Sequence, residues 1–129
     1  MRNIMKLGVA LWLATIFLSG CVTSTVVNLT PESYSRNDTG LYRVEATWRS
    51  NQQSLRGDSL TSYVVIDTIK YPMRLVENSY DRWETLIPVS EARTYVNYHF
   101  QFDFEYNRFP EKGKDSRLST VFLLTISEP

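Results

Sequence analysis

Apolar and polar residues alternate along much of the chain, and the alternation is most regular between Thr94 and Tyr106. Along this stretch every second residue is apolar, namely Val96, Tyr98, Phe100, Phe102, Phe104 and Tyr106. A period of two residues places such side chains on one face of a β-strand and the intervening polar side chains on the other. At ~3.3 Å per residue this strand is about 40 Å long, so we expect its end to project past the domain into a hairpin. The hairpin loop is expected at 109–115, and 118–126 returns as the last strand.

Shorter alternating or β-branched runs recur through the chain and are separated by turn-forming residues. They predict further strands at 25–29, 42–49, 63–69, 71–75 and 83–87, with polar loops at 32–40, 50–58 and 77–81. Pro72 has no N–H to donate to a β-ladder, which indicates an edge or a bend within its strand. After Val22 no helical period is sustained, so the pattern is that of a β protein.

Seven strand candidates in about 105 residues predict an all-β domain, an antiparallel immunoglobulin-like or fibronectin III-like β-sandwich of about seven strands. The Cys–Trp–Cys pattern of true immunoglobulin domains is absent, because the chain has a single cysteine. Tyr95 or Tyr98, near the start of the longest strand, is a candidate for a tyrosine corner. A small antiparallel barrel is the alternative fold.

The start of the chain follows a different pattern. Arg2 and Lys6 accompany a run of twelve largely apolar residues, Leu7–Leu18, which is followed by the small residues Ser19 and Gly20. A membrane-spanning helix needs roughly 20 apolar residues, so this run is too short to span a bilayer. It predicts the helix of a signal peptide, which is removed on maturation.

The residues Leu18-Ser19-Gly20-Cys21 resemble the lipobox of bacterial lipoproteins, in which a dedicated signal peptidase cuts before the cysteine. The resemblance implies cleavage between Gly20 and Cys21, a diacylglyceryl group on the Cys21 thiol and an acylated new amino terminus. Two or three acyl chains on one residue give essentially permanent attachment to a membrane. In enteric bacteria an aspartate after the cysteine favours inner-membrane retention. Because this chain has Val22 there, the resemblance implies the outer membrane, facing the periplasm.

The resemblance divides the chain into a signal peptide at 1–20, a lipidated cysteine with a short tether at 21–24 and a β-sandwich domain at 25–129. The full chain has 14 Lys and Arg against 14 Asp and Glu, and the loss of Arg2 and Lys6 leaves 12 against 14, a net charge of −2. A mildly acidic domain lacks the basic stripe of nucleic-acid-binding proteins. We therefore expect a lipid membrane as one partner, reached through acylated Cys21, and no nucleic acid.

Residues suited to catalysis or to holding a metal or cofactor are few. One cysteine and one histidine exclude an intrachain disulfide, multi-cysteine zinc sites and two-histidine metal sites within the chain. His99 lies on the polar face of the longest strand, where a solvated side chain is the usual role. Asp103 and Glu105 share that face with Cα atoms ~7 Å apart, which suits glycoside hydrolysis if a groove covers them. We predict no enzyme, no cofactor and no metal site.

A small basic cluster falls in the last hairpin. It consists of Lys112, Lys114 and Arg117, and Glu111 and Asp115 lie among these residues. The acidic residues dilute the positive charge, so we interpret this segment as a solvated loop.

Binding is the remaining class of function. Aromatic side chains in loops stack on sugars or anchor protein partners, and Tyr34, Tyr80 and Phe109 all fall in predicted loops. Sheet edges offer a further route, the addition of a partner strand. We predict a membrane-anchored envelope lipoprotein that acts as a non-catalytic structural or protein-interaction module with an envelope protein as partner. A β-sandwich that binds a glycan at the envelope is the alternative.

Overall fold

The structure is a computed structural model that describes residues 24–51 and 55–129. In this part of the chain it contains ten β-strands and no helix; the predicted signal peptide lies outside the described residues. The strands are β1 (Ser24–Asn28), β2 (Ser33–Ser35), β3 (Leu41–Ser50), β4 (Leu55–Ile66), β5 (Ile69–Pro72), β6 (Arg74–Leu75), β7 (Arg82–Pro88), β8 (Tyr95–Tyr106), β9 (Gly113–Leu118) and β10 (Phe122–Ser127).

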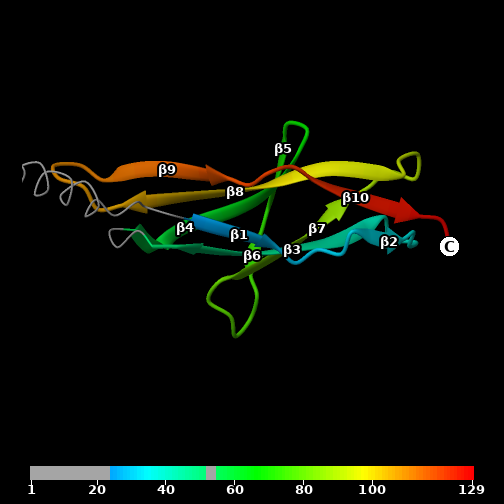
Figure 1. Cartoon of the computed structure of the whole chain (residues 1–129), viewed down its shortest axis with the longest axis horizontal. Helices are drawn as coiled ribbons and strands as arrows, with labels where there is room; N and C mark the ends of the chain where they lie inside the picture. The colour runs from blue at the N-terminus through cyan, green and yellow to red at the C-terminus, as the bar shows by residue number, and fades with distance from the viewer. Residues whose placement is uncertain (1–23, 52–54) are drawn as a thin grey trace, which may run out of the picture.

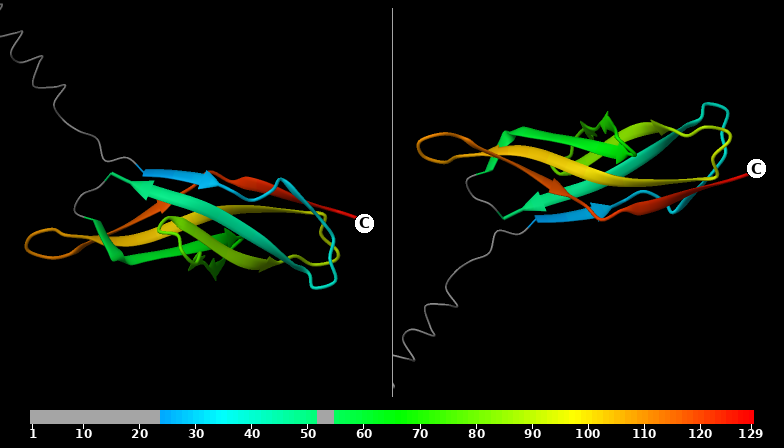
Figure 2. Two further views of the ribbon diagram at one scale, coloured as in Figure 1. Left: turned by 90° about the horizontal axis from the view of Figure 1, so that it is seen from below. Right: turned by 90° about the horizontal axis from the view of Figure 1, so that it is seen from above.

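The strands form two sheets that pack face to face (Figures 1 and 2). The four-stranded sheet has the order β1-β3-β7-β6, and the six-stranded sheet has the order β2-β10-β8-β4-β5, with β9 paired to β8. All pairs are antiparallel except β2 with β10. This order corresponds to strands A, B, E, D and G, F, C, C′ of the immunoglobulin fold. The predicted immunoglobulin-like sandwich is therefore confirmed, and the barrel alternative is wrong because neither sheet closes on itself.

Aromatic side chains of β8 fill the space between the sheets. The predicted inward set of β8, from Val96 to Phe104, is buried, as is the inward set of β3 from Tyr42 to Trp48. The Trp48 ring stacks on Phe102 with centroids 5.4 Å apart and lies 5.5 Å from the Phe104 ring. A buried aromatic side chain removes ~150–250 Å² from water, so these contacts are a main source of stability.

Tyr98 joins the two sheets at one side of the core. Its hydroxyl accepts a hydrogen bond from Asn28 Nδ2 of β1 at 2.8 Å. A tyrosine corner would instead bond to the backbone a few residues upstream. Tyr95, the other candidate, is 55% exposed. Neither tyrosine therefore forms the corner that their positions suggested.

The structure has more strands than the hydrophobic pattern predicts. Strand β4 begins at Leu55 and β9 at Gly113, both inside predicted loops, because their polar residues pair with β8. The short β2 lies inside the predicted loop 32–40 and pairs with β10. A turn at Asp67, whose φ is 55°, divides the predicted strand 63–69 between β4 and β5. Backbone ladders do not depend on side-chain polarity, which is why an apolar pattern underestimates them.

Truncation of Trp48 tests the inter-sheet aromatic contact. We expect Trp48→Ala to lower the free energy of unfolding by about 3–5 kcal/mol, since it leaves a cavity against two phenylalanine rings. Urea denaturation followed by circular dichroism measures the change. Leu123→Ala is the control: Leu123 is 55% exposed, and its truncation should change the free energy of unfolding by less than ~0.5 kcal/mol. Equal losses in the two variants would contradict the role assigned to Trp48.

Candidate functional site

The chain changes sheets between β5 and β6, beside β7. Strand β5 pairs with β4 in the six-stranded sheet, whereas β6 pairs with β7 in the four-stranded sheet. At the crossing, the Met73 N–H donates to the Ser62 carbonyl at 2.8 Å, and Pro72 has no N–H. Arg74 and Leu75 form a ladder with the outer edge of β7, and the Val76 N–H donates to the Arg82 carbonyl at 2.8 Å. In the described part of the chain, the rest of that edge has no partner strand.

Leu86 lies at the centre of this open edge. Alternate residues of β7 hydrogen-bond to β3, and this series continues just after the strand at Val89, whose N–H donates to the Gly40 carbonyl at 2.9 Å. The residues of β7 between them direct their backbone groups to the opposite edge. Glu84 pairs with Arg74 at this opposite edge, and Leu86 is the next residue of β7 whose backbone groups point to it. Its N–H and C=O therefore point to an edge where the described residues supply no strand.

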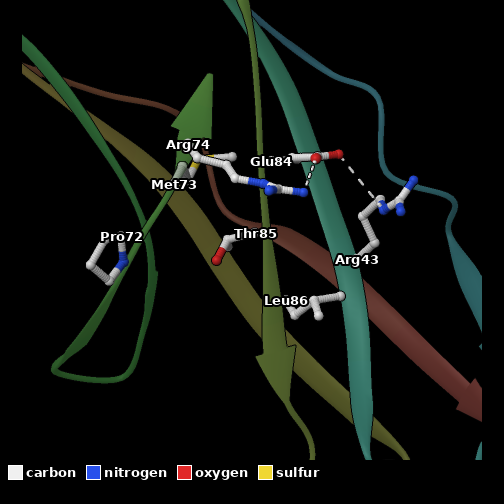
Figure 3. Close-up of a pocket in the computed structure, with 7 residues that line it drawn as sticks. All are labelled: Arg43, Pro72, Met73, Arg74, Glu84, Thr85 and Leu86. Carbon is white, nitrogen blue, oxygen red and sulfur yellow. Dashed lines mark hydrogen bonds and ion pairs between the residues drawn. The ribbon is translucent and has the colours of Figure 1, made fainter. Parts of the chain in front are cut away.

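A cleft of about 450 Å³ lies beside this edge (Figure 3). Its lining comes from β3, the β5–β6 crossing and β7, and consists of Arg43, Pro72, Met73, Arg74, Glu84, Thr85 and Leu86. The apolar part includes Met73, which is buried, and Leu86, which is 53% exposed. Apolar surface next to an open strand edge is the arrangement to which an extended peptide adds as a further strand.

Two arginines share one carboxylate at the rim of the cleft. Arg74 Nη2 lies 2.9 Å from Glu84 Oε1, and Arg43 Nε lies 3.7 Å from Glu84 Oε2. Figure 3 shows the Glu84 carboxylate between the two arginine side chains. The Glu84 side chain is 14% exposed, whereas those of Arg43 and Arg74 are 63% and 81% exposed. The rim therefore carries a solvent-accessible excess of positive charge, which suits an acidic side chain on a ligand.

The three loop aromatics predicted as binding residues lie on separate parts of the fold. Tyr34 belongs to β2, where its ring lies 5.6 Å from that of Tyr42 and its hydroxyl donates to the Arg43 carbonyl at 2.7 Å. Burial raises the pKa of the Tyr34 phenol, so it remains a neutral donor. Tyr80 is 82% exposed in the β6–β7 loop, and Phe109 is 95% exposed in the β8–β9 loop. Figure 1 shows these two loops pointing in different directions, so the three aromatics do not form one surface.

The two carboxylates considered for hydrolysis line a second hollow, of about 560 Å³, over β4, β8 and β9. Asp103 Oδ1 accepts hydrogen bonds from Gln101 Nε2 at 2.9 Å and from Ser116 Oγ at 2.6 Å. The Ser116 bond ties β8 to β9, so a structural role accounts for Asp103. His99 is half-buried opposite Val65 on the same face of the sheet. Among the described residues, no group of three or more His, Cys, Asp and Glu side chains could hold a metal ion.

Gly20 and Cys21, the predicted cleavage and lipidation residues, lie outside the described residues. Within the described ranges, 24–51 and 55–129, no helix has the length and hydrophobicity needed to cross a bilayer.

Sequence reasoning did not find the cleft. The alternation from Tyr42 to Arg49 places Arg43 on the polar face of its strand, and Pro72 signals a bend. Residues from β3, β6 and β7 meet only through the register of two strand pairs, Arg43↔Leu86 and Arg74↔Glu84. Registers between strands far apart in the chain leave no local signal in the sequence.

Comparison with known proteins concerns the fold alone. No protein-family model matches the chain, and no curated protein matches its sequence. The structure is similar to part of a DUF4785 family protein from Legionella pneumophila, with a TM-score of 0.50 and 12% identity over 84% of this chain. The chain spans only 29% of that protein's length.

Two further solved structures have lower TM-scores. The major subunit of aggregative adherence fimbriae type I from Escherichia coli has a TM-score of 0.46 and 6% identity, covering 85% of this chain and 98% of that one. Murine CRIg has a TM-score of 0.45 and 8% identity, covering 83% and 98%. At these identities none of the three neighbours assigns an activity to this immunoglobulin-like β-sandwich.

Removing the charge of Glu84 tests the electrostatics of the cleft rim. We expect Glu84→Gln to lower the free energy of unfolding by about 1 kcal/mol at low salt, because two neighbouring guanidinium groups lose their shared carboxylate. The loss should shrink at high salt, where the repulsion between the two arginines is screened. Urea denaturation at two salt concentrations measures both effects. Asp67→Asn, which breaks a single exposed pair with Arg93, is the control and should lose less. A loss that does not depend on salt would contradict this account.

Proposed function

We propose that this chain is a lipoprotein of the bacterial envelope, anchored in the membrane through acylated Cys21, whose sandwich is a non-catalytic module that binds a protein partner. The observation that carries the binding role is the open edge of β7 beside an apolar cleft with two arginines at its rim. A partner segment in extended conformation pairs with the backbone of Leu86. An acidic side chain of that segment lies between Arg43 and Arg74.

The anchor is supported by the residues Leu18-Ser19-Gly20-Cys21 and their likeness to a lipobox. Strand β1 begins at Ser24, so only Val22 and Thr23 separate the lipidated residue from the folded domain. At ~3.5 Å per extended residue, this tether holds the start of the sandwich within about 10 Å of the bilayer. Val22 after the cysteine favours the outer membrane, and a partner within the periplasm next to that membrane fits the short tether.

A glycan ligand has less support than a peptide. Sugar binding was predicted from Tyr34, Tyr80 and Phe109, which the structure does not bring together. The β7 cleft contains no aromatic side chain among its lining residues, and stacking on aromatic rings is the interaction on which the glycan prediction depended. The open strand edge favours a polypeptide, because backbone hydrogen bonds to an added strand need another backbone.

Substitution of Cys21 tests the anchor. We expect the mature wild-type protein to begin at Cys21 with acyl chains attached and to sediment with membranes. Cys21→Ser should lose the acyl chains and the mature terminus, because no thiol remains to receive the diacylglyceryl group. Mass spectrometry of the amino-terminal peptide measures both, and Thr23→Ser is the control that should behave as wild type. An unmodified thiol on Cys21 of the wild-type protein would overturn the anchor.

Photocrosslinking in living cells tests the binding role of the cleft. A photoreactive amino acid at Leu86 should yield a discrete crosslinked product, whereas the same group at Asp38, exposed in the β2–β3 loop, should not. Adding Arg74→Gln should reduce the Leu86 product several-fold, because the rim loses a cation for the partner's acidic side chain. Arg49→Gln, on the same sheet face but paired with Asp81 outside the cleft, is the matched control. Equal products from Leu86 and Asp38 would count against a specific partner at β7.

A further inference from the structure

The β8–β9 hairpin extends beyond the body of the sandwich (Figures 1 and 2). Strand β8 ends at Tyr106 and β9 begins at Gly113, so the loop of the hairpin is 107–112. This loop lies at the end of the long axis where the chain enters β1, and the C-terminus lies at the opposite end (Figure 2). The hairpin therefore projects from the end of the domain at which the chain enters the fold.

Strand pairing holds this loop in a defined position. Strands β8 and β9 stay paired along the whole of β9, as far as Tyr106 and Gly113. A Cβ atom on Gly113 would lie 2.1 Å from the Tyr106 ring, so glycine allows the ring to pack directly on the backbone at the last pair. Nearer the body, the Ser116 hydroxyl donates to Asp103 at 2.6 Å. The β8–β9 ladder therefore extends to the two residues that flank the loop.

The loop presents one bare aromatic ring among basic side chains. Phe109 is 95% exposed. Arg108, Lys112 and Lys114 lie around it in the sequence with Glu111, and Glu105 lies opposite Lys114 in the strand pairing. Three basic residues against two acidic ones leave the tip positive on a domain that is negative as a whole. In the described part of the chain, none of the three basic side chains forms an ion pair.

Arg117, which the sequence grouped with these lysines, belongs to the body of the hairpin instead. Its Nη1 lies 2.8 Å from Asp115 Oδ2, and its guanidinium carbon lies 5.9 Å from the centre of the Phe104 ring. Asp115 is thereby engaged by Arg117 and does not neutralise the tip. The three basic residues predicted as one cluster thus divide into Lys112 and Lys114 near the tip and Arg117, which forms its own ion pair behind the tip.

The loop and the start of the folded chain lie at the same end of the domain. Strand β1 begins toward the end of the sandwich from which the β8–β9 hairpin projects, and the hairpin extends beyond the start of β1 (Figure 2). Cys21 lies three residues before Ser24, so at ~3.4 Å per extended residue it is at most about 10 Å from the start of β1. A bilayer that holds the acyl chains of Cys21 is therefore within reach of the projecting loop and of Phe109.

We propose that the β8–β9 loop is a second membrane contact, in which Phe109 enters the interfacial layer of the phospholipid bilayer and Arg108, Lys112 and Lys114 meet anionic headgroups. The proposal rests on the lipid anchor proposed above. An aromatic side chain together with lysine and arginine is the combination that binds membrane interfaces. One ring at the end of a projecting hairpin can insert between lipids, whereas a protein hot spot needs a cluster of packed side chains.

A second membrane contact would fix the orientation of the anchored domain. Acyl chains on Cys21 alone set the distance of the domain from the bilayer but do not fix its orientation. With the hairpin tip also in the interface, the domain stands with its long axis pointing away from the membrane. The cleft on β7, which lies on the side of the sandwich, then faces along the membrane plane toward neighbouring envelope proteins.

Fluorescence quenching tests the contact on the mature lipoprotein, purified with its anchor and reconstituted into phosphatidylcholine–phosphatidylglycerol vesicles that contain a spin-labelled lipid. In Phe109→Trp we expect blue-shifted emission and at least about two-fold greater quenching than in Tyr80→Trp, because only the first indole enters the lipid interface. Tyr80 is a matched control, since it is 82% exposed on a loop at the side of the sandwich. Trp48 and Trp83 add the same background to both variants.

Flotation and the mass of the amino-terminal peptide, recorded on the same samples, separate the two proposals. Vesicle-bound protein with an acylated Cys21 and equal quenching of the two indoles would overturn the hairpin contact and leave the anchor intact. Protein that does not float and carries an unmodified Cys21 would overturn the anchor itself. Replacing phosphatidylglycerol with phosphatidylcholine should weaken the quenching of Phe109→Trp, and unchanged quenching would overturn the role of the basic side chains.

Discussion

The packing of the aromatic face of β8 against β3 is the contact on which the rest of the structure depends. Residues 24–129 contain no cysteine, so burial of side chains is what joins the two sheets. Trp48 of β3 lies against Phe102 and Phe104 of β8, and the Asn28–Tyr98 hydrogen bond joins the sheets at one side. Strands β1 and β7 are hydrogen-bonded to β3, and β4, β9 and β10 are hydrogen-bonded to β8. The position of each of these strands follows from that of one of the two packed partners.

Burial of one face of each central strand also decides what its other face presents to solvent. With Tyr42 and Val44 inside, Arg43 and Glu45 face outward on the four-stranded sheet. There they form ion pairs with β7, Arg43 with Glu84 and Arg82 with Glu45. The charged outer face thus reinforces the sheet, and a cleft opens beside β7 where the chain crosses between the layers from β5 to β6.

The sequence predicts the central strands well and the edges poorly, for a physical reason. Burial imposes period-two alternation, so the inward residues of β3 and β8 could be identified, and Pro72 was correctly expected at a bend. The polar start of β4 and the whole of β9 are held by backbone pairing to β8, which places no demand on side-chain hydrophobicity. Loop aromatics such as Tyr80 can be found in the sequence, but whether loops converge depends on topology. The cleft on β7 was beyond prediction because it exists only through the register of three strands.

The order of strands in the smaller sheet has a mechanical consequence. The chain enters the domain at the start of β1, and β1, β3 and β7 are consecutive neighbours in one sheet. A pull between a membrane-held N-terminus and a partner on β7 would run through these three strands alone. In the views of Figure 2 the strands run largely along the long axis, so such a load would be directed along β1 rather than across it. Hydrogen bonds of an antiparallel ladder lie perpendicular to the strands, and a load along the strand shears all of them together instead of opening them one by one. Under the proposed anchor, tension along the long axis of the sandwich would therefore be resisted by all the hydrogen bonds of each ladder at once.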